Sequence, residues 1–90
     1  MELDDATLLA HIEQGNSAAY AAFYRRHHDA VLTFLLRRTR DRRLSHDLTA
    51  ETFFAASRAA ADFDEGDGQG AGPWLSSIAR TRLREHASRP

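Results

Sequence analysis

The stretch Asp47-Leu-Thr-Ala-Glu-Thr-Phe-Phe54 decides the fold, because it predicts a helix with one acidic face and one apolar face. Asp47 and Glu51 lie four positions apart, and residues at that spacing share a helix face. The apolar side chains available to the interior are Leu48, Phe53 and Phe54. Alanine, the best helix former, is frequent in the segment that follows. We therefore expect a helix from about residue 45 to residue 61.

Capping residues and apolar spacing predict two helices before this one. Asp4 or Asp5 can cap a helix over about residues 6–14, which ends at Gly15. A longer helix, over about residues 18–39, can be capped by Asn16 or Ser17. The side chains expected in the core are Leu8, Leu9 and Ile12 from the first helix and Ala19, Tyr20, Phe23, Ala30, Val31, Phe34 and Leu35 from the second. Residues 40–43 are expected to form a short polar turn.

A fourth helix is expected after an acidic, glycine-rich loop at residues 64–72. Gly72 would cap this helix, and Pro73 would take its first position, where a missing N–H group is tolerated. Its apolar face carries Trp74, Leu75, Ile78, Ala79 and Leu83. No segment reads as a strand, so the predicted fold class is all-α, a compact bundle of about four helices.

Composition limits the chain to one small domain, expected to span residues 1–90. An apolar share of 42% supplies one core and leaves little room for a deep substrate cleft. Cysteine is absent, which excludes disulfides, thiolate metal sites and thiol catalysis. No apolar run reaches membrane-spanning length, and the acidic start of the chain is unlike a signal peptide. We therefore expect a cytoplasmic protein with no membrane association.

The residue patterns of enzyme active sites are missing from the sequence. The histidines form neither a His-x-x-x-His nor a Glu-x-x-His motif, and no nucleophile–base motif or phosphate-binding loop occurs. We expect no enzymatic activity, no catalytic residue, no metal, no cofactor and no small-molecule substrate. A metal-dependent hydrolase would need a carboxylate–histidine cluster that the sequence lacks.

Charge is strongly segmented along the chain although the net charge is only −1. Residues 1–23 hold four acids and no base, and residues 24–43 hold seven arginines against two acids. Residues 44–72 hold six acids against one arginine, and residues 73–90 hold four arginines against one acid. Such blocks often form solvated helix faces, but the planar guanidinium fork also suits phosphates and carboxylates.

An ordered set of segments resembles the second conserved region of extracytoplasmic-function (ECF) sigma factors, which are bacterial transcription initiation factors. The resemblance spans almost the whole chain, and its specificity lies in the order and spacing of the segments. They are Asp5-Ala-Thr-Leu-Leu9, Gly15-Asn-Ser-Ala-Ala-Tyr-Ala-Ala-Phe23, Leu35-Leu-Arg-Arg-Thr-Arg-Asp41, Leu44-Ser-His-Asp-Leu-Thr-Ala-Glu-Thr-Phe-Phe54, Phe63 and Trp74-Leu-Ser-Ser-Ile-Ala-Arg80.

The resemblance implies a domain that binds core RNA polymerase and helps to melt the minus-ten promoter element, which it recognises as single-stranded DNA. The helix around residues 45–61 would dock on the clamp helices of the largest polymerase subunit. Its expected contact residues are Asp47, Leu48, Glu51 and Phe54. Because Glu51 lies too deep in the helix to act through the helix dipole, a docking role explains it better than a capping role.

The loop before the fourth helix would, by the same resemblance, accept a promoter base flipped out of the stack. Asp67 and Gln69 are the candidates for hydrogen bonds to that base. Arg80 and Arg84 share a helix face and would contact promoter phosphates, which positions a protein without reading sequence. Arg82 would face solvent or form an intramolecular pair. Trp74 could stack on DNA, although a core position fits its apolar neighbours better.

Three departures from the family pattern affect details. Ala50 stands where the family commonly has glutamine, and Thr81 stands where asparagine is common. The linker between Phe63 and Trp74 is acidic and somewhat long, which bears on promoter specificity. The family's second domain, a helix-turn-helix that reads the minus-thirty-five element, is absent from these 90 residues. An anti-sigma factor is a further expected partner, and the alternative function is a sigma-like interaction module bound by such a regulator without promoter reading.

Overall fold

A computed structural model describes residues 2–64 and 70–89 of the chain. In this part the chain forms four α-helices and one short 3-10 helix, with no strand. The elements are α1 (Asp5–Glu13), α2 (Ser17–Thr39), α3 (Arg42–Arg58), η1 (Ala60–Asp62) and α4 (Gly72–Ala87). The prediction of an all-α bundle is therefore confirmed. No helix in these residues is both long and apolar enough to span a membrane.

The first two helices begin where capping chemistry predicts. The Asp4 carboxylate accepts the backbone N–H of Thr7 at 2.8 Å, so Asp4 rather than Asp5 is the cap of α1. The side-chain oxygen of Asn16 accepts the backbone N–H of Ala19 at 2.9 Å and caps α2. Gly15 lies between the two helices with φ +87°, a conformation that costs glycine little.

The third helix begins earlier than predicted. Its cap is Asp41, whose carboxylate accepts the backbone N–H of Leu44 at 3.0 Å, so Arg42 and Arg43 are helical instead of forming a turn. The reversal after α2 is compressed into Arg40, which adopts φ +54° and donates its N–H to the carbonyl of Leu36 at 2.9 Å. The helix also ends earlier than predicted, at Arg58, and η1 follows it.

The fourth helix also differs at its start. Ala71 is its cap, so Gly72 and Pro73 take the first two helical positions. Ala71 is fully buried, and its N–H group is bonded by a distant side chain described below. Local signals alone predict a cap at Gly72, because proline is common at the first position of a helix.

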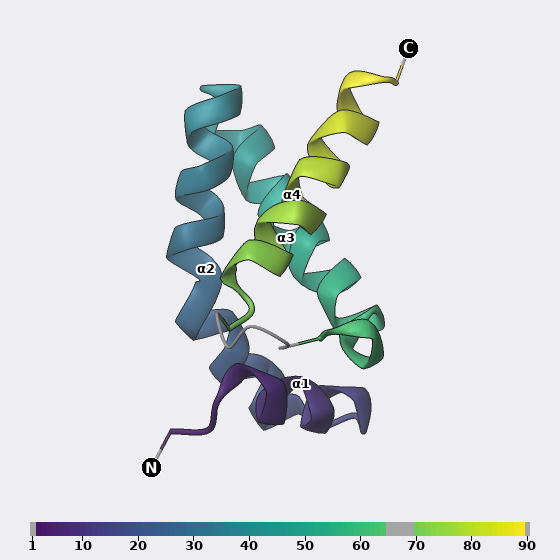
Figure 1. Ribbon diagram of the computed structural model, residues 1–90. Coiled ribbons are helices and arrows are strands. Elements are labelled where there is room, and N and C mark those ends of the chain that lie inside the picture. The colour runs from purple at the N-terminus through teal and green to yellow at the C-terminus, as the bar shows by residue number, and fades with distance from the viewer. Residues whose placement is uncertain (1, 65–69, 90) are drawn as a thin grey trace.

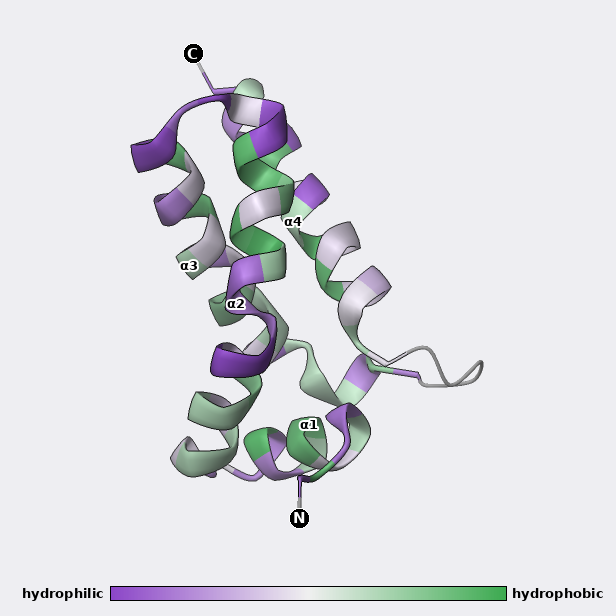
Figure 2. Ribbon diagram, turned by 90° about the vertical axis from the view of Figure 1, so that its left-hand side faces the viewer, coloured by the Kyte–Doolittle hydropathy of each residue, from purple (hydrophilic) through white to green (hydrophobic). Residues whose placement is uncertain are grey.

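The helices pack around one core. Figure 1 shows α2, α3 and α4 running along the long axis of the molecule, with α1 crossing them at one end. Figure 2 shows strongly hydrophilic segments where α2 ends and α3 begins, and others partway along α2. The largest apolar side chains with almost no exposed surface are Phe23, Phe53, Leu9, Leu35, Leu48 and Leu75. Arginines at the end of α2 are thus kept outside the core, on the rim of the bundle.

Buried hydroxyl groups of α3 form hydrogen bonds within the fold. Thr49 and Thr52 each donate to the carbonyl oxygen four residues earlier, at 2.7 Å. The hydroxyl groups of Ser45 and Thr39 lie 2.6 Å apart and join α3 to α2. Because each of these polar groups has a partner, the apolar side of α3 can be buried without the cost of an unsatisfied group.

Candidate functional site

One side of α3 is open to solvent and carries the sequence-predicted docking residues. We call this side the outer face of α3 and define it by Asp47, Ala50, Glu51, Phe54 and Arg58, which follow one another at helical spacing. Asp47 and Phe54 are exposed, and Glu51 is half-buried. Within the described residues, neither carboxylate forms an ion pair or a side-chain hydrogen bond.

Phe54 points outward, contrary to the expectation that it is available to the interior. Its side chain is 61% exposed, whereas its neighbour Phe53 is 1% exposed. The buried stripe of α3 contains Ser45, Leu48, Thr49, Thr52, Phe53 and Ala56. A rotation of about 100° per residue carries Phe54 out of this stripe. The guanidinium carbon of Arg58 lies 5.7 Å from the ring centroid of Phe54. Most of the Phe54 ring is nevertheless in contact with water.

Leu48 does not belong to the outer face. It is 1% exposed and packs in the core, so its side chain is not available to a partner in this conformation. Polymerase contact by Leu48 stays a prediction, and its burial favours an indirect role through the packing of α3. Asp47 beside it is exposed, because adjacent helical residues point in different directions.

The arginines of α4 divide as their spacing predicts. Arg80 and Arg84 are both exposed on one side of the helix. Arg82 instead pairs with Glu85, with 2.9 Å between guanidinium nitrogen and carboxylate oxygen. Arg84 also donates to the hydroxyl of Thr81 at 3.4 Å. The two exposed guanidinium groups have no carboxylate partner among the described residues and remain available to an anionic ligand.

Trp74 packs mainly against the protein. Its ring centroid lies 5.2 Å from that of Phe63 in an edge-to-face arrangement, and both rings are partly buried against the core. This contact joins the residue that follows η1 to the first turn of α4. The Trp74 ring is only partly buried, so a ligand can still contact it. Asp67 and Gln69, the candidates for base recognition, lie outside the described residues.

Asp5 holds the start of α4 against the first two helices, a role that the sequence did not indicate. Its Oδ2 atom accepts the backbone N–H of Ala71 at 2.8 Å. Its Oδ1 atom accepts a hydrogen bond from Nη1 of Arg26 and one from Nε2 of His27, both at 2.9 Å. Gly70 lies so close that a Cβ atom there would meet Oδ2 at 3.0 Å. One carboxylate thus joins three segments that are remote in sequence.

The surroundings of Asp5 favour its charged form. Burial alone would raise the pKa of this carboxyl, because it removes water from the anion. Hydrogen bonds from His27, Ala71 and Arg26 act in the opposite direction and together hold the pKa of Asp5 below its usual value. The ionised carboxylate therefore contributes to the stability of the native arrangement at neutral pH.

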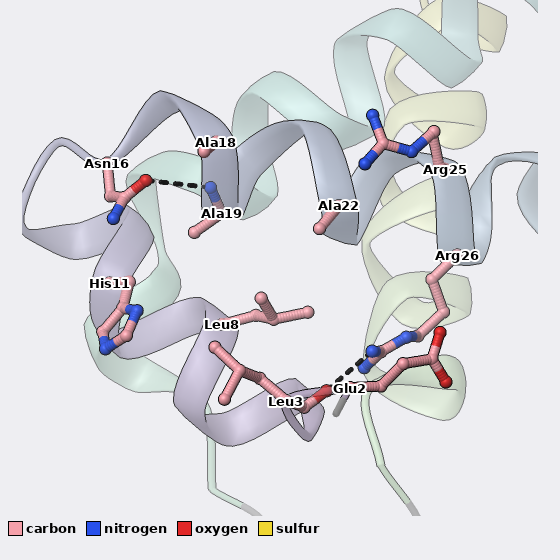
Figure 3. Close-up of a pocket in the computed structure, with 10 residues that line it drawn as sticks. All are labelled: Glu2, Leu3, Leu8, His11, Asn16, Ala18, Ala19, Ala22, Arg25 and Arg26. Atoms are coloured by element: carbon pink, nitrogen blue, oxygen red, sulfur yellow. Dashed lines mark hydrogen bonds between the residues drawn. The ribbon is translucent and has the colours of Figure 1, made fainter.

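A hollow of about 820 Å³ lies between α1 and α2 (Figure 3). Leu8, Ala19 and Ala22 line its apolar part, and Arg25 and His11 lie among its polar lining residues. Arg26 closes one end by donating to the backbone carbonyl of Leu3 at 2.6 Å. Among its described lining residues there is no carboxylate–histidine or nucleophile–base pair of the kind that catalysis requires.

A comparison with protein families matches residues 23–89 to Sigma-70 region 2. The chain belongs to this family. The match begins in α2 and includes the outer face of α3 and all of α4. Sigma-70 region 2 is a module of transcription initiation factors that binds RNA polymerase and promoter DNA, and it is not an enzyme. Neither the curated proteins nor the solved structures searched contain a match to the chain.

Proposed function

We propose that this domain docks on core RNA polymerase through the outer face of α3 and recognises the minus-ten element as single-stranded DNA. The observation that carries the docking surface is the pair Asp47 and Glu51, two carboxylates on one face without a partner in the described structure. Phe54 adds an apolar side chain that is 61% exposed. Exposed apolar surface that is rimmed by polar groups marks protein-binding sites.

The partner surface on polymerase should be basic with an apolar depression. Cationic side chains would pair with Asp47 and Glu51, and the depression would receive the ring of Phe54. The coiled clamp helices of the largest polymerase subunit are the proposed partner. Leu48 would act from below this surface by holding α3 to the core, since it is buried.

The DNA-binding side comprises α4 and the segment before it. Arg80 and Arg84 provide exposed guanidinium groups for backbone phosphates, which fix register without reading sequence. Asp67 and Gln69 are proposed to contact an extruded base, and Trp74, which is only partly buried, is proposed to stack on DNA. Replacing Asp67 and Gln69 by alanine should reduce discrimination between a consensus and a scrambled minus-ten strand. Equal discrimination by the variant would contradict base reading by these two residues.

Within the sigma-70 family, we assign the chain to the ECF group. The order of its motifs supports this assignment, from the opening helix to the Trp-Leu-Ser-Ser-Ile-Ala-Arg segment. An anti-sigma factor would then regulate it. The hollow between α1 and α2 favours this second partner, because an apolar floor with a basic rim suits an amphipathic helix that carries acidic residues. A module bound only by such a regulator is the alternative function.

Charge reversal tests the docking surface. The double variant Asp47→Arg/Glu51→Arg should lose core polymerase in a pull-down while its circular dichroism and melting temperature change little. A matched control is Glu2→Arg/Glu13→Arg, which alters net charge equally at two exposed acids of the N-terminal region. Polymerase binding at wild-type strength by the first variant would show that the face is wrongly assigned. Unfolding would show that the carboxylates are structural.

A further inference from the structure

Two arginines, one from each helix, lie over the ring of one phenylalanine where α2 and α4 pack side by side. The guanidinium carbon of Arg38 lies 3.7 Å from the ring centroid of Phe34, and that of Arg80, from the other helix, lies 5.7 Å from it. Arg37 lines the same groove, which has a volume of about 480 Å³. We call this feature the α2–α4 groove and define it by Thr33, Phe34, Arg37, Arg38, Ser76 and Arg80.

Helical spacing explains why these residues meet. Thr33, Phe34, Arg37 and Arg38 occupy positions i, i+1, i+4 and i+5 of α2 and so cover one side of that helix. Ser76 lines the groove from α4, and Arg80, four positions further along α4, extends its guanidinium group to the ring of Phe34. Phe34 is half-buried, so its ring forms an apolar floor on which two guanidinium groups rest.

The positive charge of the groove is not neutralised by the described part of the protein. Arg26 and Arg82 each pair with a carboxylate at 2.9 Å, but Arg37, Arg38 and Arg80 have no such partner among these residues. Arg38 donates only to the backbone carbonyl of Phe34, at 3.3 Å. The acid among the lining residues is Asp29, whose carboxylate is fully exposed and is bonded to His28.

Stacking on Phe34 prepares the groove for an anion. A guanidinium group that rests on an aromatic ring loses less freedom when it binds a ligand, and its planar fork matches the oxygens of a phosphate. The hydroxyl groups of Thr33 and Ser76 lie in the same groove and are further donors. An open groove with three cations in or beside it suits a chain of phosphates better than a single enclosed ion.

We propose that the α2–α4 groove binds the phosphodiester backbone of single-stranded DNA, with Arg37 and Arg38 acting together with Arg80. This inference rests on the proposed function, because the strand is the promoter strand assigned above to α4. Arg80 belongs both to the proposed phosphate-binding face of α4 and to the α2–α4 groove. A DNA strand that follows α4 therefore reaches the groove without a break. The groove adds affinity and register, while base discrimination stays with the segment before α4.

The salt dependence of binding tests this site. For a single strand, log K falls with log[salt] by roughly 0.7 for each phosphate that the protein neutralises. The variant Arg37→Ala/Arg38→Ala, bound to core polymerase, should therefore show a slope that is smaller by roughly 1.4 for a labelled minus-ten oligonucleotide. Arg25→Ala is the matched control, because it removes an exposed arginine from the other half of α2. It should leave the slope unchanged.

Two further measurements separate the possible outcomes. Arg38→Lys keeps the charge and should retain the slope, which excludes a loss caused by misfolding. A neutral methylphosphonate placed at successive linkages of the oligonucleotide should weaken the wild-type complex at one or two positions and leave the double variant unaffected there. An unchanged slope in the double variant would overturn the proposal. So would a loss of polymerase binding, which would make the groove a protein-docking surface.

The experiments distinguish failure of the groove proposal from failure of the proposed minus-ten function. If wild-type protein with polymerase does not prefer the consensus strand at all, the minus-ten assignment fails. If that preference is present and equal in wild type and the double variant, with equal salt slopes, only the groove assignment fails.

Discussion

The carboxylate of Asp5 accepts the backbone N–H of Ala71 at 2.8 Å, although the two residues are 66 positions apart in the chain. This bond connects the first residue of α1 to the cap of α4. The same carboxylate is held by Arg26 and His27 of α2. The start of the proposed DNA-binding helix is therefore fixed by a residue at the opposite end of the sequence.

Removing the Asp5 carboxylate should destabilise the domain. Asp5→Ala leaves a buried N–H group at Ala71 and two donors on α2 without their acceptor, and we expect a loss of about 2–3 kcal/mol in the free energy of unfolding. Asp4→Ala is the control, since it removes only a helix cap at an exposed position and should cost less than Asp5→Ala. Urea denaturation followed by circular dichroism measures both. Equal losses for the two variants would contradict a special role for Asp5.

Acidification should weaken the fold partly through Asp5. The folded-state pKa of this residue lies below its unfolded value, so its contribution to stability is complete above the unfolded pKa and is lost as pH falls through the folded pKa. Asp4, whose pKa is lowered chiefly by its hydrogen bond with Thr7, acts in the same direction. We expect the free energy of unfolding to fall as pH drops below the unfolded pKa of aspartate, about 3.9. Asp5→Asn should flatten this pH dependence, and an unaltered curve would assign the acid sensitivity to other carboxylates.

Adjacent phenylalanines of α3 should behave in opposite ways. Phe53→Ala removes a ring that is 1% exposed and should cost about 3–5 kcal/mol of stability. Phe54→Ala removes a ring that is 61% exposed, so the melting temperature should change little while affinity for core polymerase falls. Thermal melting and a polymerase pull-down measure the two effects. Undiminished polymerase binding by Phe54→Ala would exclude its ring from the interface.

The isolated domain should bind closed duplex DNA poorly. Its net charge is −1, and its exposed arginines are divided between α2, α3 and α4. Sequence-independent affinity grows with the number of phosphates neutralised at one time, and only a few guanidinium groups share a surface here. Fluorescence anisotropy at physiological salt should therefore detect weak, salt-sensitive binding. Tight and sequence-specific binding to duplex would contradict recognition of a single strand.

The sequence by itself determined the local elements of this protein. The carboxylate of Asp4 and the amide of Asn16 stand at the starts of α1 and α2 because capping requires only the next three residues. The apolar spacing of Phe23, Val31 and Leu35 likewise predicted buried positions, since helical periodicity is a local property. The family could also be recognised from the order and spacing of short motifs.

Tertiary structure alone decided which helix faces are covered and which distant groups meet. The packing of α3 against the bundle turned Leu48 inward and Phe54 outward, although both are apolar residues of one helix. The bonds of Asp5 and the grouping of Arg38 and Arg80 over Phe34 require particular distances between helices. Periodicity shows that a helix has two faces, but the neighbouring helices determine where each face points. The contacts proposed here to act on polymerase and DNA depend on that arrangement.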